Sequence, residues 1–276
     1  MEVIFNKLFY IENSKSAREI KYLDNINLII NQGSIVGFIG DKLDIIGKLL
    51  LVLRRPSKGE IRIDNTIIKR SSHIENVNLL RKKIGFVSSE YDKLFLEPSV
   101  LKEISTTMKN YGYHTEMTVK HVVQSLKIVG LDETYLDKDP NELSSVEKKK
   151  IELASVISYN PELIIVDNFE KGMNYREREY FRKLFLKLKN KFDKTIIIIS
   201  NDVSFMFDIV DNVHVINSGK LVLSEGKDIF YNTNLYKFVK MPKIIEFTKY
   251  AEYEGHDIKK CTDIKELIKE LYRNVR

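Results

Sequence analysis

Residues 34 to 49 read Ser-Ile-Val-Gly-Phe-Ile-Gly-Asp-Lys-Leu-Asp-Ile-Ile-Gly-Lys-Leu. The apolar run that ends at Ile39 has the composition of a buried strand. A second apolar run, from Leu49 to Leu53, is typical of a helix that packs against such a strand. A strand, a loop that contains glycine and a helix, in this order, make the setting of a phosphate-binding loop. The stretch therefore predicts an α/β sheet with a candidate site at Gly40.

The chemistry of a phosphate-binding loop is incomplete in this stretch. The motif is G-x-x-x-x-G-K-[ST], in which glycine amides and a lysine contact phosphates and a hydroxyl binds Mg²⁺. Here Gly47 comes two positions late, and Leu49 follows Lys48 where the hydroxyl is needed. Asp41 and Asp44 would add negative charge beside a phosphate. We expect a packed or irregular loop without a phosphate-sized nest.

The composition is that of a soluble globular protein of 276 residues. Lysine and arginine number 45 against 39 acidic residues, and they are dispersed, so we predict no nucleic-acid partner. The single cysteine, Cys261, excludes an intramolecular disulfide and a cysteine-based zinc site. No apolar run approaches the ~20 residues that span a bilayer, so any attachment to a membrane is expected through a partner.

Alternating apolar and polar residues predict several strands that are buried on one face. These strands are expected over residues 3–10, 22–30, 59–64 and 83–87. Apolar residues at helical spacing follow over 118–129 and over 147–158, and Gly130 is placed to end the first of these helices. The lysine run 148–150 is expected to face solvent.

Two continuous apolar runs, 163–167 and 195–200, are typical of strands buried on both faces of a parallel sheet. A helix around residues 180–188 separates them, and a hairpin around Ser218-Gly219 follows. Strands that alternate with helices predict one α/β domain over residues 1–230.

The remaining residues, 231–276, are expected to form a small helical extension. In its first helix we expect Ile244, Phe247 and Ala251 to face inward. Asp263 has the spacing of a capping residue for a second helix.

Several landmarks of the chain stand in a fixed order, from the strand before Gly40 to Ser200-Asn-Asp202. The order resembles the nucleotide-binding subunit of an ATP-binding-cassette (ABC) transporter over residues 1–230, and within that superfamily most resembles the ATPase subunits of energy-coupling-factor (ECF) transporters. The landmarks between are Gly59-Glu-Ile-Arg-Ile-Asp64, Leu80-Arg-Lys-Lys-Ile-Gly-Phe-Val87, Glu142-Leu-Ser-Ser-Val-Glu147 and Asn160-Pro-Glu-Leu-Ile-Ile-Val-Asp167.

The resemblance implies the ABC-type P-loop NTPase fold. This fold has a parallel-core sheet flanked by helices, an antiparallel β-subdomain and a helical subdomain, here at about residues 90–158. The extension 231–276 resembles one that some ECF ATPase subunits carry, and it is a possible dimerisation element.

The resemblance also implies a role for each motif position, and most of these positions are substituted. The family signature Leu-Ser-Gly-Gly-Gln corresponds to Leu143-Ser144-Ser145-Val146-Glu147. Asp167 matches the Mg²⁺-orienting aspartate, and no other metal ligand is expected. The position of the catalytic glutamate holds Asn168, which cannot accept a proton. Ser89 replaces the metal-sensing glutamine, and Asn201 replaces the histidine that contacts the γ-phosphate.

Two further positions depend on the family frame. The chain from Gly40 to Gly59 is about three residues shorter than the family expects, so that a lysine in register would fall at Ile46 and Gly47-Lys48 is a coincidence of sequence. Glu12 stands where the family has an aromatic residue that stacks on adenine.

The resemblance therefore implies a catalytically degenerate subunit of an ECF-type importer for a vitamin or metal micronutrient. It would act at the cytoplasmic face of the membrane as scaffold or regulatory partner. Its partners would be an intact ATPase homologue, a membrane-embedded coupling subunit and a substrate-binding membrane subunit, with ATP bound weakly or not at all. One alternative is an active, divergent ATPase that uses ATP and Mg²⁺. Another is a soluble adaptor derived from a cassette.

Overall fold

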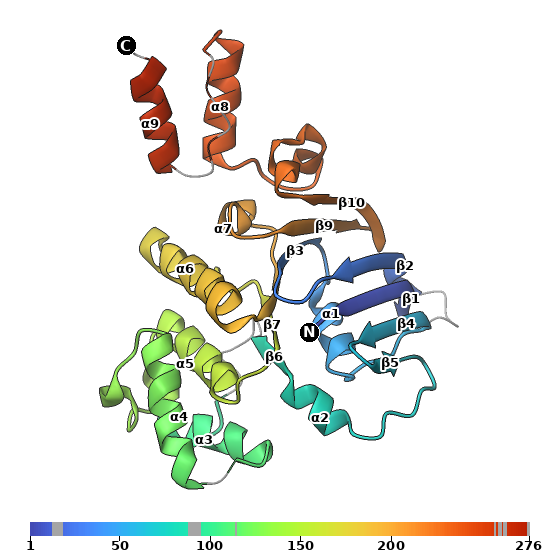
Figure 1. Ribbon diagram of the computed structural model, residues 1–276, viewed down its shortest axis with the longest axis vertical. Coiled ribbons are helices and arrows are strands. Elements are labelled where there is room, and N and C mark those ends of the chain that lie inside the picture. Colours follow the sequence, from blue (N-terminus) through green and yellow to red (C-terminus); the bar gives the residue numbers. More distant parts are fainter. Residues whose placement is uncertain are drawn as a thin grey trace.

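A computed structural model describes residues 1–12, 19–87, 95–113, 115–256, 258, 261 and 264–274. Its centre is a six-stranded sheet in the order β10-β9-β3-β8-β7-β6, parallel except for the pair β9 and β10 (Figure 1). The strands are β3 (Ile35–Gly40), β6 (Ile84–Val87), β7 (Leu163–Asp167), β8 (Thr195–Ile199), β9 (Asn212–Asn217) and β10 (Lys220–Gly226).

Alternate residues of the central strands enter two separate hydrophobic cores, one on each face of the sheet. In β7, Ile164 and Val166 face the core that contains the helices, whereas Leu163 and Ile165 face the other core. Every residue of β7 and β8 is buried, as predicted from their continuous apolar runs.

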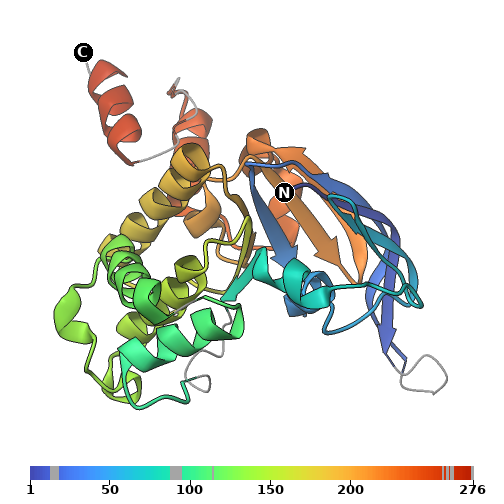
Figure 2. The same cartoon turned by 60° about the horizontal axis from the view of Figure 1, so that its bottom comes forward.

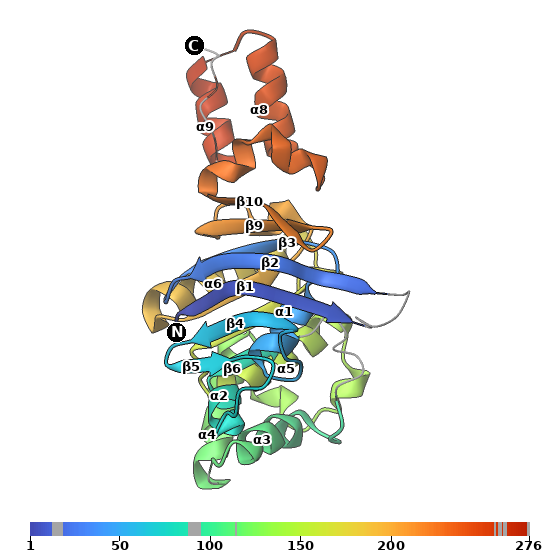
Figure 3. The same ribbon diagram turned by 90° about the vertical axis from the view of Figure 1, so that its right-hand side faces the viewer.

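A four-stranded antiparallel sheet covers the second face, in the order β2-β1-β4-β5 (Figure 3). Its strands are β1 (Val3–Glu12), β2 (Ile20–Ile30), β4 (Lys58–Ile63) and β5 (Thr66–Ile68). Between the two sheets lies the short helix α1 (Asp44–Leu50), whose residues Ile46, Leu49 and Leu50 are fully buried.

Helices cover the first face of the central sheet and extend from it to one side (Figure 2). Helix α6 (Tyr175–Phe192) begins at Asn174, whose side chain forms a capping box with Glu177, and it ends at the left-handed Asp193. The other helices on this side are α3 (Val100–Asn110), α4 (Thr115–Ile128), α5 (Ser145–Ser158) and α7 (Val203–Met206), with 3₁₀ turns at Glu133–Tyr135 and Pro140–Glu142. Helix α2 (Val77–Lys82) instead places Leu80 in the core on the second face.

The C-terminal residues form a separate layer beyond β10 (Figures 1 and 3). Two 3₁₀ turns, Lys227–Tyr231 and Thr233–Lys237, lead into α8 (Lys243–Tyr253) and α9 (Ile264–Asn274). Ala251 is buried as expected, but Phe247 is 42% exposed, so the prediction that it faces inward is wrong. Ile245 and Thr248 take the inward positions of α8. Asp263 lies outside the described residues.

Within the described ranges, no helix has the length and apolar character required to cross a bilayer.

Candidate functional site

Three predicted site residues meet at one edge of the central sheet. Gly40 ends β3, Asp167 ends β7, and Asn201 follows β8, which lies between those two strands. Because parallel strands present their carboxyl ends at the same edge, their loops converge there. The candidate site consists of residues 40–43, 167–168 and 200–202. We name it the nucleotide edge, after the ligand that the family resemblance implies for these positions.

The connection from β3 to the following helix is short. It consists of Asp41 to Leu43, and α1 begins at Asp44, so that Gly47 and Lys48 lie in the helix and not in the loop where their sequence suggested. Leu43 is 2% exposed, whereas Asp41 and Lys42 are exposed. The connection is therefore only partly packed.

In α1, Gly47 and Lys48 contact other residues of the protein. A Cβ atom on Gly47 would lie 2.5 Å from Cε2 of Phe86, so the glycine permits close contact between α1 and β6. The ammonium group of Lys48 forms an ion pair with Asp44, one helical turn earlier. Ile46, in register with the family lysine, is fully buried.

The side chain of Asn201 is hydrogen-bonded to the backbone at the start of the candidate loop. The backbone N–H of Gly40 donates a hydrogen bond of 2.9 Å to Oδ1 of Asn201. The contact joins the end of β3 to the segment after β8, and it uses an amide that a phosphate-binding loop would offer to an anion.

The side chains of Asp167 and Asn168 are hydrogen-bonded to each other. The side-chain amide of Asn168 donates a 2.6 Å hydrogen bond to Oδ1 of Asp167. Asn168 has a left-handed backbone with φ of 47°, which asparagine tolerates better than most residues, and its backbone N–H donates to the Ile199 carbonyl. The residue at the general-base position therefore donates a hydrogen bond instead of accepting a proton.

The signature residues cap a helix. Ser144 is the N-cap of α5, and its side chain and backbone form a capping box with Glu147. The Tyr135 hydroxyl donates a 2.5 Å hydrogen bond to the second carboxylate oxygen of Glu147. The Ser144 hydroxyl, followed by that of Tyr135, lowers the pKa of Glu147 to about 2, and the carboxylate raises the pKa of Tyr135 to about 12.

The polar signature residues Ser144 and Glu147 are hydrogen-bonded within the helical part of the protein and not to the nucleotide edge, among the residues that the structure describes. Ser145 is exposed in the first turn of α5, and Val146 is partly buried against the core on the helical face. The hydrogen bonds of Ser144 and Glu147 stay among the helical elements, with each other and with Tyr135.

The family model described as ABC transporter matches residues 23–170, more than half of the chain. The chain belongs to the ABC transporter family. The predicted family is thereby confirmed.

This ABC protein is also similar to known ECF proteins. It is 28% identical to the energy-coupling factor transporter ATP-binding protein EcfA2 of Streptococcus agalactiae, over 92% of this chain and 93% of the relative. The corresponding protein of Enterococcus faecalis is 27% identical, over 92% and 90%. The predicted likeness to ECF ATP-binding subunits is confirmed.

Solved ABC cassettes share its fold. The structure of CbiO1 from Clostridium perfringens, described as part of the ABC transporter complex cbiONQ, has a TM-score of 0.73 at 24% identity and covers 90% of this chain and 98% of that one. The dimeric cassette MJ0796, bound to ADP and Pi, also has a TM-score of 0.73, at 22% identity, with 82% and 98% covered. The predicted fold class is confirmed.

The groups at the nucleotide edge and in α1 of this ABC protein do not match those that a Mg²⁺–nucleotide requires. Ile46, in register with the family lysine, is fully buried. Lys48 points to an aspartate on its own helix, and Leu49 after it is fully buried and has no hydroxyl for a metal. The Gly40 amide already donates to Asn201. Three interactions of a phosphate-binding loop are thus missing or used internally.

Glu12, at the position predicted to correspond to the adenine-stacking residue of the family, is hydrogen-bonded to other side chains of the protein. Glu12 accepts hydrogen bonds of 3.1 Å from the hydroxyl groups of Tyr10 and Tyr22. The ammonium group of Lys42 lies 5.6 Å from the Tyr22 ring centroid. A tyrosine is therefore near the loop, but its hydroxyl is held by Glu12.

Two of the buried charged residues of this ABC protein, Lys149 and Glu170, were not predicted as buried from the sequence. Lys149 is 2% exposed, so the prediction that the whole lysine run faces solvent is wrong. Its ammonium group donates to the carbonyl oxygens of Phe169, at 2.7 Å, and of Lys171. Helical spacing was a usable signal, because Lys149 shares a face with Leu153 and Val156.

The second missed residue is Glu170, three positions after Asp167. Its carboxyl group is 3% exposed and accepts a 2.6 Å hydrogen bond from the Ser200 hydroxyl, and burial raises its pKa. The sequence carried no periodic signal for it, since it lies in a loop. Ser89 falls outside the described residues.

Proposed function

We propose that this chain is a cassette subunit of an ECF-type importer that does not hydrolyse ATP itself and serves as scaffold or regulatory partner of an intact ATPase subunit. One observation carries the proposal. Groups at the nucleotide edge that would contact a nucleotide or Mg²⁺ are bonded to one another: Gly40 to Asn201 and Asp167 to Asn168.

These two hydrogen bonds, together with the substituted residues, remove both the electrostatic and the acid–base contributions to phosphoryl transfer. Asn168 has no basic atom to accept a proton from water, and it competes for the Asp167 carboxylate that would hold Mg²⁺. Lys48 neutralises Asp44 instead of a phosphate. Single contributions of these kinds are worth ~10²-fold or more in rate, and they are lost together.

The similarity to energy-coupling factor transporter ATP-binding proteins supports the transport setting. An importer of this class would place the chain at the cytoplasmic face of the membrane, attached through a membrane-embedded coupling subunit that engages a substrate-binding membrane subunit. The substrate would be a vitamin or a metal micronutrient. ATP and Mg²⁺ would bind at the intact partner.

Titration of the purified chain with a fluorescent ATP analogue and Mg²⁺ tests the proposal. We expect no saturable binding below about 1 mM, because each lost phosphate contact removes a charge-assisted hydrogen bond. EcfA2 of Streptococcus agalactiae, titrated in parallel, is the positive control.

A dissociation constant in the micromolar range, together with ATP hydrolysis that the Asp167→Asn variant abolishes, would contradict the proposal. That result would establish the alternative of an active but divergent ABC ATPase.

A further inference from the structure

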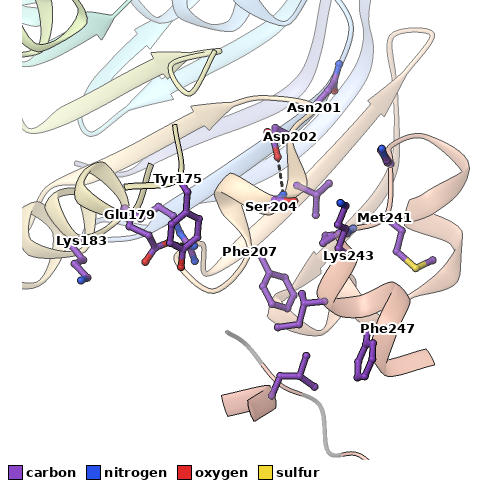
Figure 4. Close-up of a pocket in the computed structure, with 16 residues that line it drawn as sticks. Tyr175, Glu179, Lys183, Asn201, Asp202, Ser204, Phe207, Met241, Lys243 and Phe247 are labelled. Atoms are coloured by element: carbon purple, nitrogen blue, oxygen red, sulfur yellow. Dashed lines mark hydrogen bonds and ion pairs between the residues drawn. The ribbon is translucent and has the colours of Figure 1, made fainter. Parts of the chain in front are cut away.

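A large cleft separates the cassette from its helical extension. Its volume is about 900 Å³, within the range of small-molecule pockets. One wall is the first half of α6 with Tyr175 and Glu179, the floor is α7 with Phe207, and the opposite wall is the start of α8 (Figure 4). Leu267 of α9 completes the lining. The cleft thus lies between elements far apart in the sequence.

The acidic groups that line the cleft are already neutralised. Asp202 forms an ion pair of 2.5 Å with Arg178, and Glu179 forms one of 2.5 Å with Arg182. Arg182 is further paired with Asp208. These contacts leave little negative charge to repel or to bind a ligand.

Three lysines of the cleft, Lys183, Lys240 and Lys243, are exposed. Among the described residues none of them has an acidic partner within ion-pair distance. Lys183 stands on α6, and the other two stand on the opposite side at the entry to α8, so positive charge borders the cleft from both walls (Figure 4). An anion is the ligand that complements this arrangement.

Between the lysines the lining is largely apolar. Aliphatic and aromatic side chains come from α7, from the residue that follows it, from the segment before α8 and from both helices of the extension: Val203, Phe207, Met241, Ile244, Phe247 and Leu267. An apolar body that enters the cleft loses contact with water and gains ~25 cal/mol per Å² of apolar surface buried. A polyphosphate would leave this surface uncovered.

We propose that the cleft binds an organic carboxylate with an apolar body, of the size and amphipathic character of a medium-chain fatty acid. The carboxylate would meet the lysines at the rim, and the chain would lie against Phe207, Met241 and Phe247. Such a ligand would hold the extension against α6 and α7. The cleft shares Asn201 and Asp202 with the nucleotide edge. The inference still does not rest on the proposed function, because the lysines and apolar side chains that would hold the ligand lie outside that edge.

The experiment uses the full chain and the fluorescent probe 8-anilinonaphthalene-1-sulfonate, an anion with an aromatic body. We expect saturable binding of one probe molecule per chain, which laurate displaces and ADP does not. In the double variant K240Q/K243Q, binding should weaken about three- to tenfold, since an exposed charge interaction contributes ~0.2–1 kcal/mol. The matched control K187Q removes an exposed lysine of α6 outside the cleft and should bind as the parent does.

A second pair of variants tests the apolar wall. Phe247→Ala should weaken probe binding about fivefold, because part of an aromatic face is removed from the site. Tyr250→Ala removes an exposed ring from the same helix outside the cleft and should have no effect. Binding that is unchanged in both K240Q/K243Q and Phe247→Ala would overturn the proposal, as would displacement of the probe by ADP or its persistence in about 1 mM laurate.

Discussion

Asn168 and Glu170 are two polar residues whose side chains are hydrogen-bonded inside the protein. Both follow the end of β7, and Glu170 contacts the residue that follows β8. The Asn168 amide donates a hydrogen bond to the Asp167 carboxylate, and the buried Glu170 accepts one hydrogen bond from the Ser200 hydroxyl. Its second oxygen, Oε2, has no hydrogen-bond partner among the described residues. A buried carboxyl group of this kind is most stable when it is protonated.

Replacement of Glu170 by glutamine should therefore stabilise the protein at neutral and alkaline pH. The folded-state pKa is raised above the unfolded value, so the wild type loses stability as pH rises through the folded pKa, while glutamine stays neutral. At pH 8 we expect Glu170→Gln to raise Tm by a few degrees, the effect of about 1 kcal/mol in a domain of this size. Thermal unfolding at pH 4.5 and pH 8 measures it.

At pH 4.5 the difference in Tm should shrink, because a carboxyl group with a raised pKa is protonated to a greater extent there than at pH 8. Glu246→Gln, which changes an exposed carboxylate on α8, should alter Tm little at either pH. An equal gain at both pH values would contradict protonation as the cause.

At the residue scale the sequence predicted which family positions are substituted, but not what the substitutes contact. That Asn201 accepts a hydrogen bond from Gly40 depends on β3 and β8 being neighbours, which no local pattern specifies. Lys149 was misjudged for a related reason. The carbonyl groups that stabilise its buried charge come from residues 169 and 171, in a different segment of the chain.

At the scale of elements, α1 has one especially close contact besides its buried apolar side chains. Gly47 sits against the ring of Phe86, and a methyl group in its place would overlap the ring. Gly47→Ala should destabilise the protein by about 1–3 kcal/mol, the usual cost of overpacking, although alanine is the better helix former. Chemical denaturation measures the change.

The double variant Gly47→Ala/Phe86→Leu should recover part of that loss, because the smaller side chain leaves room for the methyl group. A Gly47→Ala protein as stable as the parent would contradict this reading of the contact. The sequence predicted the neighbouring strands from their periodicity. It did not predict the role of Gly47, which had appeared to belong to a loop.

At the scale of the whole molecule, both helices of the extension expose apolar side chains. Tyr253 is 86% exposed, Tyr272 is 74% exposed and Ile268 is 46% exposed, and α8 and α9 lie at one end of the molecule, beyond β10 (Figure 1). We propose that these side chains contact the intact ATPase partner of the proposed importer. A helical extension was predicted from the sequence, whereas its exposed rings were not.

The double variant Tyr253→Glu/Tyr272→Glu should then reduce the amount of intact cassette homologue that co-purifies from membranes by about tenfold, the effect of ~1.4 kcal/mol. Leu79→Glu changes an exposed apolar residue on α2 and is the matched control. Equal recovery of the homologue with both variants would contradict the pairing role. A chain recovered only outside the membrane fraction would favour the soluble adaptor.

Lys149 joins α5, which follows the signature segment, to the loop after β7 through two carbonyl groups. Amine-reactive reagents modify lysines that water can reach, and this ammonium group is 2% exposed. The Lys149 amine becomes accessible only when α5 and the loop after β7 separate locally. The rate at which this amine is labelled would therefore report that separation, without a nucleotide or an attached dye.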